Sequence, residues 1–296
     1  MTAFKHDLLI HERTQAQIEA FLSHPTHAML IVGIAGSGKP TLAKQTAANL
    51  LDIDEQNLAN YPYYLRLDVP EEKQEIPIDN VRELIEKLKL KTPGRTGIRR
   101  TVIIEDAQRM SAEGQNALLK TLEEPGDDTV FVLTATSAKH VAPTIVSRTQ
   151  EVNSLPVGLE TANDYYKGKF SSQDIASNWA LSGGAPGLLN SLLNDSADHA
   201  LKTAVDDFKA YLAKDSYGRL LEAERLSKDK YYLAYFLDAG GRVLRALQQG
   251  SVKSGQTAKA SSLGKARKQV IKLQEQLRAN TSPRLLAIAL ALNLKL

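Results

Sequence analysis

Short apolar runs alternate with segments of helical periodicity over the first half of the chain. The runs are rich in β-branched residues and are bounded by polar or turn-forming residues, which is typical of buried strands. The intervening segments place apolar residues three and four positions apart, as one face of a helix requires. This alternation predicts a parallel sheet with helices on both faces. The expected strands are Ala28–Val32, Tyr63–Leu67, Thr101–Ile104 and Val130–Thr136, and the expected helices are Gln15–Leu22, Leu42–Leu50, Ile78–Leu88 and Ser111–Glu124.

The strand pattern ends near Pro156, and the rest of the chain has helical periodicity. Short helices are expected around the glycine-rich segment Ser182–Gly187, and longer ones follow it. Among these longer helices, Gly240 and Gly241 mark the clear interruption. The predicted division has three parts: an α/β domain at 1–155, a small helical domain at 156–197 and a C-terminal helical domain at 198–296.

A glycine-rich segment joins the first expected strand to the helix after it. It matches the phosphate-loop pattern G-x-x-x-x-G-K, in which glycines turn the backbone tightly and the lysine reaches phosphate. The next position normally carries a hydroxyl that binds Mg²⁺, but here it is Pro40. Proline has neither a hydroxyl nor an N–H, and Thr41 lies about 100° further round the helix. The pattern predicts a nucleotide-binding loop with weakened affinity for ATP and Mg²⁺. Its candidate residues are Gly33, Gly36, Ser37, Gly38, Lys39, Pro40 and Thr41.

Two carboxylates, Glu105 and Asp106, follow the third expected strand. In open α/β sheets, ligands bind at the carboxyl ends of the strands. A carboxylate there can hold Mg²⁺ through water and polarise an attacking water molecule. The alternative is a pair of solvated acids without a role. Because a phosphate loop lies upstream, we take Glu105 and Asp106 as catalytic candidates.

Composition limits the possible functions without choosing one. The chain has 296 residues, of which 43% are hydrophobic and 24% charged, as in ordinary globular proteins. It has no cysteine, which excludes disulfides and cysteine-bound zinc. We identify neither a signal peptide nor an apolar run of about 18 residues, so we expect a cytoplasmic protein that does not span a membrane.

Positive charge is concentrated near the C-terminus. Residues 251–296 contain nine basic residues and one acid, a formal charge of +8, which leaves −5 for residues 1–250. Such a segment could bind nucleic acid or an acidic partner, or it could be a solvated helix face. No aromatic residues are interleaved with these charges, so direct binding of DNA is only one of these alternatives.

Three segments resemble the clamp-loader branch of AAA+ proteins, in particular its bacterial DNA polymerase III delta-prime members and their gamma/tau relatives. The first is the glycine loop. The second, Ile103–Met110, contains the two acids, and the third, Gln115–Pro125, is more specific than the glycine loop. In addition, Ser147-Arg148-Thr149 resembles the family's Ser-Arg-Cys motif. The resemblance covers nearly the whole chain.

The resemblance implies a subunit of a five-membered ring, with an AAA+ domain, a helical lid and a C-terminal collar. Its partners would be gamma/tau and delta subunits, and the ring would use ATP to place a sliding clamp on primed DNA. Arg148 would be an arginine finger that acts on ATP bound by the neighbouring subunit. Thr134 and Thr136 lie where the family's first sensor residue lies, and we include them among the nucleotide-binding candidates.

Departures from the family pattern favour a delta-prime-like subunit with weak or absent ATPase activity. Pro40 replaces the Mg²⁺ ligand, and Glu105-Asp106 reverses the usual Asp-Glu order. Gly187 is followed by Leu188 where active members often carry an arginine that senses ATP. Two alternatives stay open: a gamma-like subunit that itself hydrolyses ATP, and a DNA-repair or recombination AAA+ factor that binds DNA directly.

Overall fold

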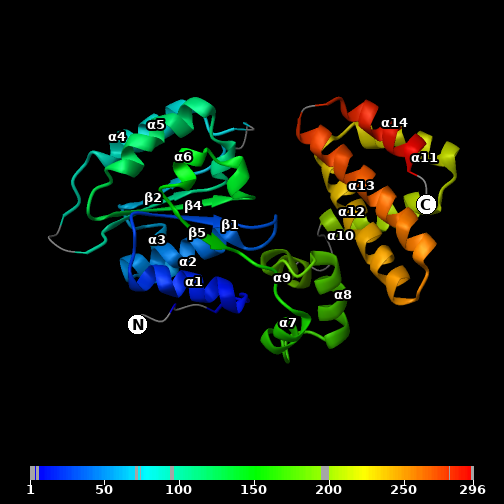
Figure 1. The fold of residues 1–296 in the computed structure, drawn as a ribbon, viewed down its shortest axis with the longest axis horizontal. Coiled ribbons are helices and arrows are strands. Elements are labelled where there is room, and N and C mark those ends of the chain that lie inside the picture. Colours follow the sequence, from blue (N-terminus) through cyan, green and yellow to red (C-terminus); the bar gives the residue numbers. More distant parts are fainter. Residues whose placement is uncertain are drawn as a thin grey trace. The chain divides into compact units, whose positions relative to one another are not determined.

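The computed structural model describes residues 4, 7–70, 73, 75–93, 97–194, 200–279 and 281–294 (Figure 1). The chain divides into two units. The α/β unit contains residues 1–165 and 184–188, and the helical unit contains residues 166–183 and 189–296. The segment 184–188 therefore belongs to a different unit from the residues on either side of it. The finer division into three domains stays a prediction.

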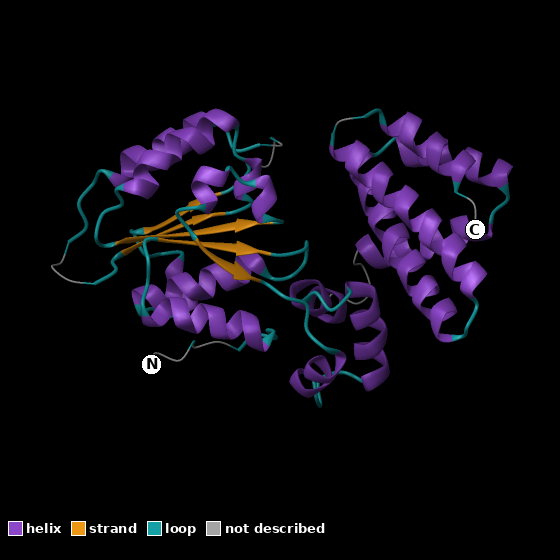
Figure 2. Ribbon diagram, in the orientation of Figure 1, coloured by secondary structure: helices purple, strands orange, loops and turns teal. Residues whose placement is uncertain are grey.

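The α/β unit is built on one sheet of five parallel strands in the order β2-β3-β4-β1-β5. Every residue of β1, β3 and β4 is buried, because these mostly apolar strands are covered on both faces. The edge strands β2 and β5 are more polar and more exposed. Figure 2 shows the strands in orange, and their bounds are β1 Ala28–Val32, β2 Tyr64–Leu67, β3 Arg100–Ile104, β4 Thr129–Ala135 and β5 Gln150–Asn153.

Helices cover both faces of this sheet (Figure 1). One face carries α4 (Ile78–Leu88), α5 (Ala112–Glu123) and α6 (Pro143–Val146). The opposite face carries α1 (Glu12–Ser23), α2 (Lys39–Leu51) and α3 (Glu55–Leu58). The remaining helical elements of the unit are the short η1 (Ala107–Arg109), η2 (Ala138–His140) and α7 (Leu159–Tyr165).

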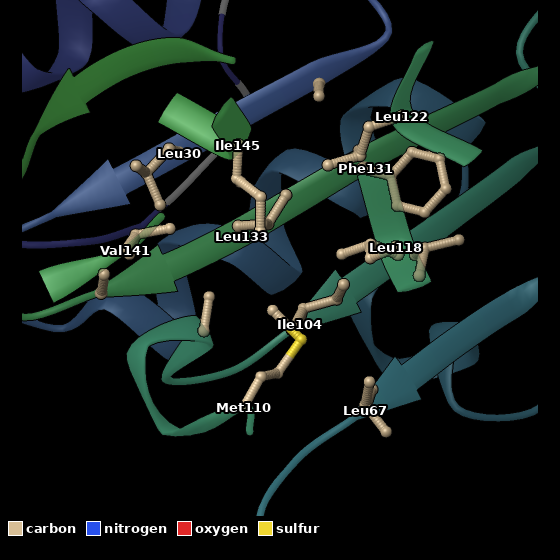
Figure 3. Packing of buried hydrophobic residues seen from close by; sticks show 14 of the residues in the cluster. Leu30, Leu67, Ile104, Met110, Leu118, Leu122, Phe131, Leu133, Val141 and Ile145 are labelled. Carbon is tan, nitrogen blue, oxygen red and sulfur yellow. The ribbon is translucent and has the colours of Figure 1, made fainter. Parts of the chain in front are cut away.

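The core of the α/β unit lies in two layers, one on each side of the sheet. Phe131 and Leu133 of β4 join the layer under α4 and α5, whereas Val130 and Val132 join the layer against α1 and α2. This alternation follows from the two-residue period of a strand. Figure 3 shows the first layer, with Phe131 beside Leu118 of α5. The predicted fold class, a parallel sheet with helices on both faces followed by a helical region, is confirmed.

The helical unit contains the second half of the chain. In it α12 packs against α10 and α13, and α11 packs against α14. None of the described helices is both long enough and apolar enough to cross a membrane. The bounds are α8 Ser172–Ser182, α10 Ala200–Ala213, α11 Ser216–Ser227, α12 Lys230–Lys253, α13 Thr257–Arg278 and α14 Pro283–Asn293, while α9 (Pro186–Asn194) starts in the α/β unit and ends in the helical unit.

The interruption expected at Gly240 and Gly241 is wrong, because α12 runs through both residues. Gly240 is buried against α10, and a Cβ atom there would lie 2.4 Å from Cε2 of Phe208. A Cβ atom on Gly241 would meet nothing within 4 Å. Gly240 is therefore needed for the close approach of two helices and does not break either of them. Strand β5 was not predicted, since its four residues, Gln150–Asn153, include only one apolar side chain.

Candidate functional site

The glycine loop connects the end of β1 to the start of α2. Gly36 and Gly38 have φ angles of +79° and +83°, in the left-handed region that glycine adopts without steric cost. Ser37 is buried between them, and its carbonyl oxygen accepts a hydrogen bond from Ser154 Oγ at 2.9 Å. Pro40 lies in the first turn of α2, where a missing N–H does not disturb the helix. Pro40 and Thr41 are exposed.

Lys39 is folded back into its own loop. Its Nζ donates hydrogen bonds to the carbonyl oxygens of Gly33 and Ile34, at 2.9 and 3.1 Å. Only 5% of the residue is exposed. Burial lowers the pKa of Lys39, and the negative charge of Asp106 acts in the opposite direction. The amino group that would reach a phosphate is therefore held by two backbone carbonyls.

The start of α9 lies directly on the glycine loop. Leu188 N–H donates a hydrogen bond of 2.8 Å to the carbonyl oxygen of Gly36. A Cβ atom on Gly36 would lie 2.7 Å from Leu188 Cβ, and a Cβ atom on Gly187 would lie 3.0 Å from the backbone nitrogen of Gly38. Both sides of this contact belong to the α/β unit. Gly36 and Gly38 are thus contacted by residues that follow them by about 150 positions, while Ile34 and Ala35 of the loop stay exposed.

The two candidate carboxylates at the end of β3 have different surroundings. Glu105 Oε1 lies 3.0 Å from Arg66 Nε, and Arg66 belongs to the edge strand β2. Asp106 has a φ of +51°, its Oδ1 accepts a hydrogen bond from Gln108 at 3.1 Å, and its charge acts on Lys39. Of the two acids, Asp106 therefore lies on the side of the glycine loop, and Glu105 is paired across the edge of the sheet.

The two candidate threonines at the end of β4, Thr134 and Thr136, also have different surroundings. Thr134 is buried, and its Oγ1 accepts a hydrogen bond of 3.0 Å from the backbone N–H of Asp106. Thr136 is exposed, its N–H donates to Gln108 Oε1 at 3.3 Å, and its Oγ1 lies 3.3 Å from His140 Nδ1. Thr134 thus helps to hold the backbone of Asp106, while Thr136 lies among surface groups.

Arg148 lies just after α6 and is partly exposed. Its guanidinium donates a 2.8 Å hydrogen bond to the carbonyl oxygen of Thr144 and a 2.5 Å hydrogen bond to Glu123 Oε1. The side chains of Arg148 and Glu123 are 34% and 48% exposed. The bond to Thr144 holds one side of the guanidinium against the end of α6. The outer edge of the guanidinium faces Glu123 and solvent.

Arg148 and the glycine loop lie at opposite ends of two neighbouring strands, β5 and β1. Strand β5 begins at Gln150, which pairs with Met29 near the start of β1, and the parallel register ends with Asn153 beside Val32. The glycine loop follows Val32, whereas Arg148 precedes Gln150. With a rise of about 3.3 Å per residue, the paired rungs alone separate the two by roughly 10 Å. Arg148 is therefore not placed to act on a ligand of its own glycine loop.

ATP with Mg²⁺, which the glycine loop predicts, fits these residues poorly. Lys39 is held by backbone carbonyls, Leu188 lies on the loop, and Pro40 supplies no hydroxyl. Glu105, one of the two candidate carboxylates, is paired with Arg66. Among the described residues, no three His, Asp or Glu side chains lie close enough together to share a metal ion.

Three contacts of this site were not predicted from the sequence: those made by Leu188, Arg66 and Glu123. Contacts between distant segments leave no local pattern, so Leu188 and Arg66 gave no signal. Glu123 did give one, because two acids, Glu123 and Glu124, end α5 where the helix dipole disfavours negative charge. A nearby cation is the expected compensation, and Arg148 supplies it.

Comparisons with known proteins point to one family. The family model of the DNA polymerase III delta subunit matches residues 12–157. The delta-prime subunit of DNA polymerase III from Pseudomonas aeruginosa is 38% identical over 136 residues, 41% of this chain and 41% of that protein. The delta-prime subunit from Haemophilus influenzae is 27% identical over 220 residues, 69% of this chain and 66% of that protein. The matches thus span less than two thirds of the length of these curated relatives.

A solved structure supports the fold over most of the chain. The DNA polymerase III gamma subunit-related protein of Thermotoga maritima superposes with a TM-score of 0.52, covering 95% of this chain and 97% of that one. The two sequences are 18% identical, so this likeness concerns the fold alone.

Proposed function

Since this chain belongs to the delta-prime family of clamp-loader proteins, we propose that it is a clamp-loader subunit that does not itself hydrolyse ATP. It assembles with gamma/tau and delta subunits into a five-membered ring that places a sliding clamp on primed DNA. Its chemical contribution is Arg148, which acts on ATP held by the neighbouring subunit. Its own glycine loop takes no part in the reaction.

The position of Arg148 is the observation that carries this proposal. The residue precedes β5, at the end of the strands opposite to its own loop, and a third of its side chain is exposed. A fixed guanidinium stabilises the charge that develops on a transferring phosphoryl group. From this end of the strands, the triphosphate that Arg148 can reach is one bound by another protomer.

The test is reconstitution with the gamma/tau and delta subunits, the clamp and primed DNA. Adding this chain is expected to raise clamp-dependent ATP hydrolysis well above that of the other subunits alone. The same rate with and without this chain would contradict the proposal.

The isolated chain is expected to bind ATP with Mg²⁺ no more tightly than about 1 mM. The amino group of Lys39 would have to leave two carbonyl oxygens, and Leu188 would have to leave Gly36. The two hydrogen bonds of the charged Lys39 amino group are worth about 1.5–3 kcal/mol each, so giving them up removes most of the affinity of a micromolar site. Titration calorimetry of the wild-type chain and of Lys39→Ala measures this. Micromolar binding that Lys39→Ala abolishes would instead support the gamma-like alternative.

A further inference from the structure

The helix α13 carries the strongest charge imbalance in the helical unit. It contains six basic residues and one acid, a formal charge of +5. Three of its lysines, Lys265, Lys268 and Lys272, are spaced by three and four residues, so they share one face of the helix. All three are exposed. The opposite side is held in the core by Leu263, Ala266, Val270 and Leu273, which are at most 5% exposed, so this rotation of α13 is fixed by packing.

These three lysines lack the ion pairs that some other helical cations form. In the part of the chain that the structure describes, Lys87 pairs with Glu83, and Lys209 pairs with Asp206. No described carboxylate forms an ion pair with any of the three lysines of α13. Like charges three or four residues apart destabilise a helix by about 0.2–0.5 kcal/mol per pair. The lysine face thus carries a repulsion that no described ion pair offsets, since its one acid, Glu275, lies three residues after Lys272 but forms no ion pair with it.

The residues around the lysines indicate which kind of anion would offset it. Ser261, Gln269, Gln276 and the exposed Glu275 lie on the same side of α13, and the helix has no aromatic residue. The buried centre of a protein interface is usually poor in lysine and rich in aromatic side chains, so an acidic protein partner fits this face badly. Single-stranded nucleic acid is bound on aromatic stacking platforms, which are also missing here. A face with lysines and no aromatic residues matches the phosphate backbone of double-stranded DNA, which is bound through charge.

We propose that the lysine face of α13, formed by Lys265, Lys268 and Lys272, binds the phosphate backbone of double-stranded DNA without reading its sequence. Seven residues of helix rise about 10 Å, and the phosphates of one DNA strand follow each other at about 3.4 Å along the duplex axis. The face therefore spans about three phosphate steps. This contact is separate from the role of Arg148, and it does not require bound ATP.

The test measures binding of the full-length chain to a fluorescent duplex of about 30 base pairs between 50 and 200 mM salt. One variant carries Lys265→Gln, Lys268→Gln and Lys272→Gln, which keeps helix-forming side chains. A matched control carries Lys87→Gln, Lys89→Gln and Lys209→Gln, which removes the same amount of charge from lysines that form ion pairs. Lys87 lies in α4, Lys89 directly follows α4, and Lys209 lies in α10. Circular dichroism checks that both variants are folded, and the three single α13 variants replace the triple one if it is not.

The α13 triple variant is expected to lose at least tenfold in affinity at 100 mM salt. Its plot of log K against log salt should be less steep than that of the wild type by about 3, since each neutralised phosphate contributes about 0.9. Each single variant should change the slope by about 0.9, the control variant should bind like the wild type, and two unrelated duplex sequences should bind equally.

Three results would overturn the proposal. The first is no binding of duplex DNA by the wild-type chain at 50 mM salt. The second is an equal loss of affinity in the α13 variant and the control variant, which would mean that only net charge matters. The third is competition by poly-glutamate as effective as that by unlabelled DNA, which would identify an acidic protein as the partner. Because no ATPase subunit is present, these results do not depend on the proposed role of Arg148.

Discussion

Replacing Arg148 with alanine is expected to slow ATP hydrolysis at the neighbouring subunit's site by about 10³-fold or more. Arginine fingers contribute about 10³–10⁵ to such rates, because a fixed guanidinium stabilises the charge of the transition state. In the structure the Arg148 guanidinium donates hydrogen bonds to the carbonyl oxygen of Thr144 and to Glu123, so its position is set before the complex assembles. Single-turnover hydrolysis in the reconstituted complex, with clamp and primed DNA, is the measurement.

Two further variants separate the finger from a general loss of charge. Arg82→Ala removes an exposed arginine of α4 that pairs with Asp79, and it is expected to leave the rate unchanged. Glu123→Gln removes the partner of Arg148 but keeps the guanidinium. Exposed ion pairs are typically worth about 0–1 kcal/mol, so we expect at most a few-fold change. Size-exclusion chromatography confirms that each complex assembles. A complex that contains Arg148→Ala and still hydrolyses ATP at the wild-type rate would refute the proposed function.

Gly240→Ala is expected to destabilise the helical unit by about 1–3 kcal/mol, the usual effect of overpacking a core. The added methyl group would lie 2.4 Å from Cε2 of Phe208, and that ring is itself packed against Tyr211 and Phe236. The ring therefore has little room to move, and α10 and α12 would have to separate. Urea unfolding followed by the fluorescence of Trp179, the single tryptophan, measures this in the helical unit.

The matched control for this prediction is the next residue of the same helix. Gly241→Ala adds the same methyl group where nothing lies within 4 Å. Because alanine is a better helix former than glycine by about 0.8–1 kcal/mol, this variant is expected to be slightly more stable than the wild type. Equal urea midpoints for the two variants would show that the close approach at Gly240 does not control stability.

The parallel sheet could be predicted because its central strands are continuous apolar runs. Residues Ala28–Val32 are buried along their whole length, as their composition indicates, and the glycines after them produce a tight turn wherever they occur. The helix Ile78–Leu88 was predicted with the correct bounds, since its apolar residues follow the helical period closely. Each of these features depends on residues close together in the sequence.

The details of the candidate site depend on contacts between distant residues, and these could not be predicted. Nothing near Lys39 indicates that its amino group binds the carbonyls of Gly33 and Ile34 instead of facing outward. The pairing of Glu105 with Arg66 arises because β2 and β3 are neighbours in the sheet. For Gly240 the local signal was misleading. Its residue type suggested a helix break, but the glycine is needed because the Phe208 ring of another helix lies against it.

The chain passes between its two units three times, after Tyr165, after Gly183 and after Leu188. One cut therefore cannot divide the protein into intact halves. A truncated protein that ends at Tyr165 would keep all five strands and the glycine loop but would lose Leu188, so the carbonyl oxygen of Gly36 would be open to water. Shortening the protein in this way removes a contact of the glycine loop as well as a domain. If the proposed function is correct, such a fragment is expected to bind nucleotide more tightly than the intact chain.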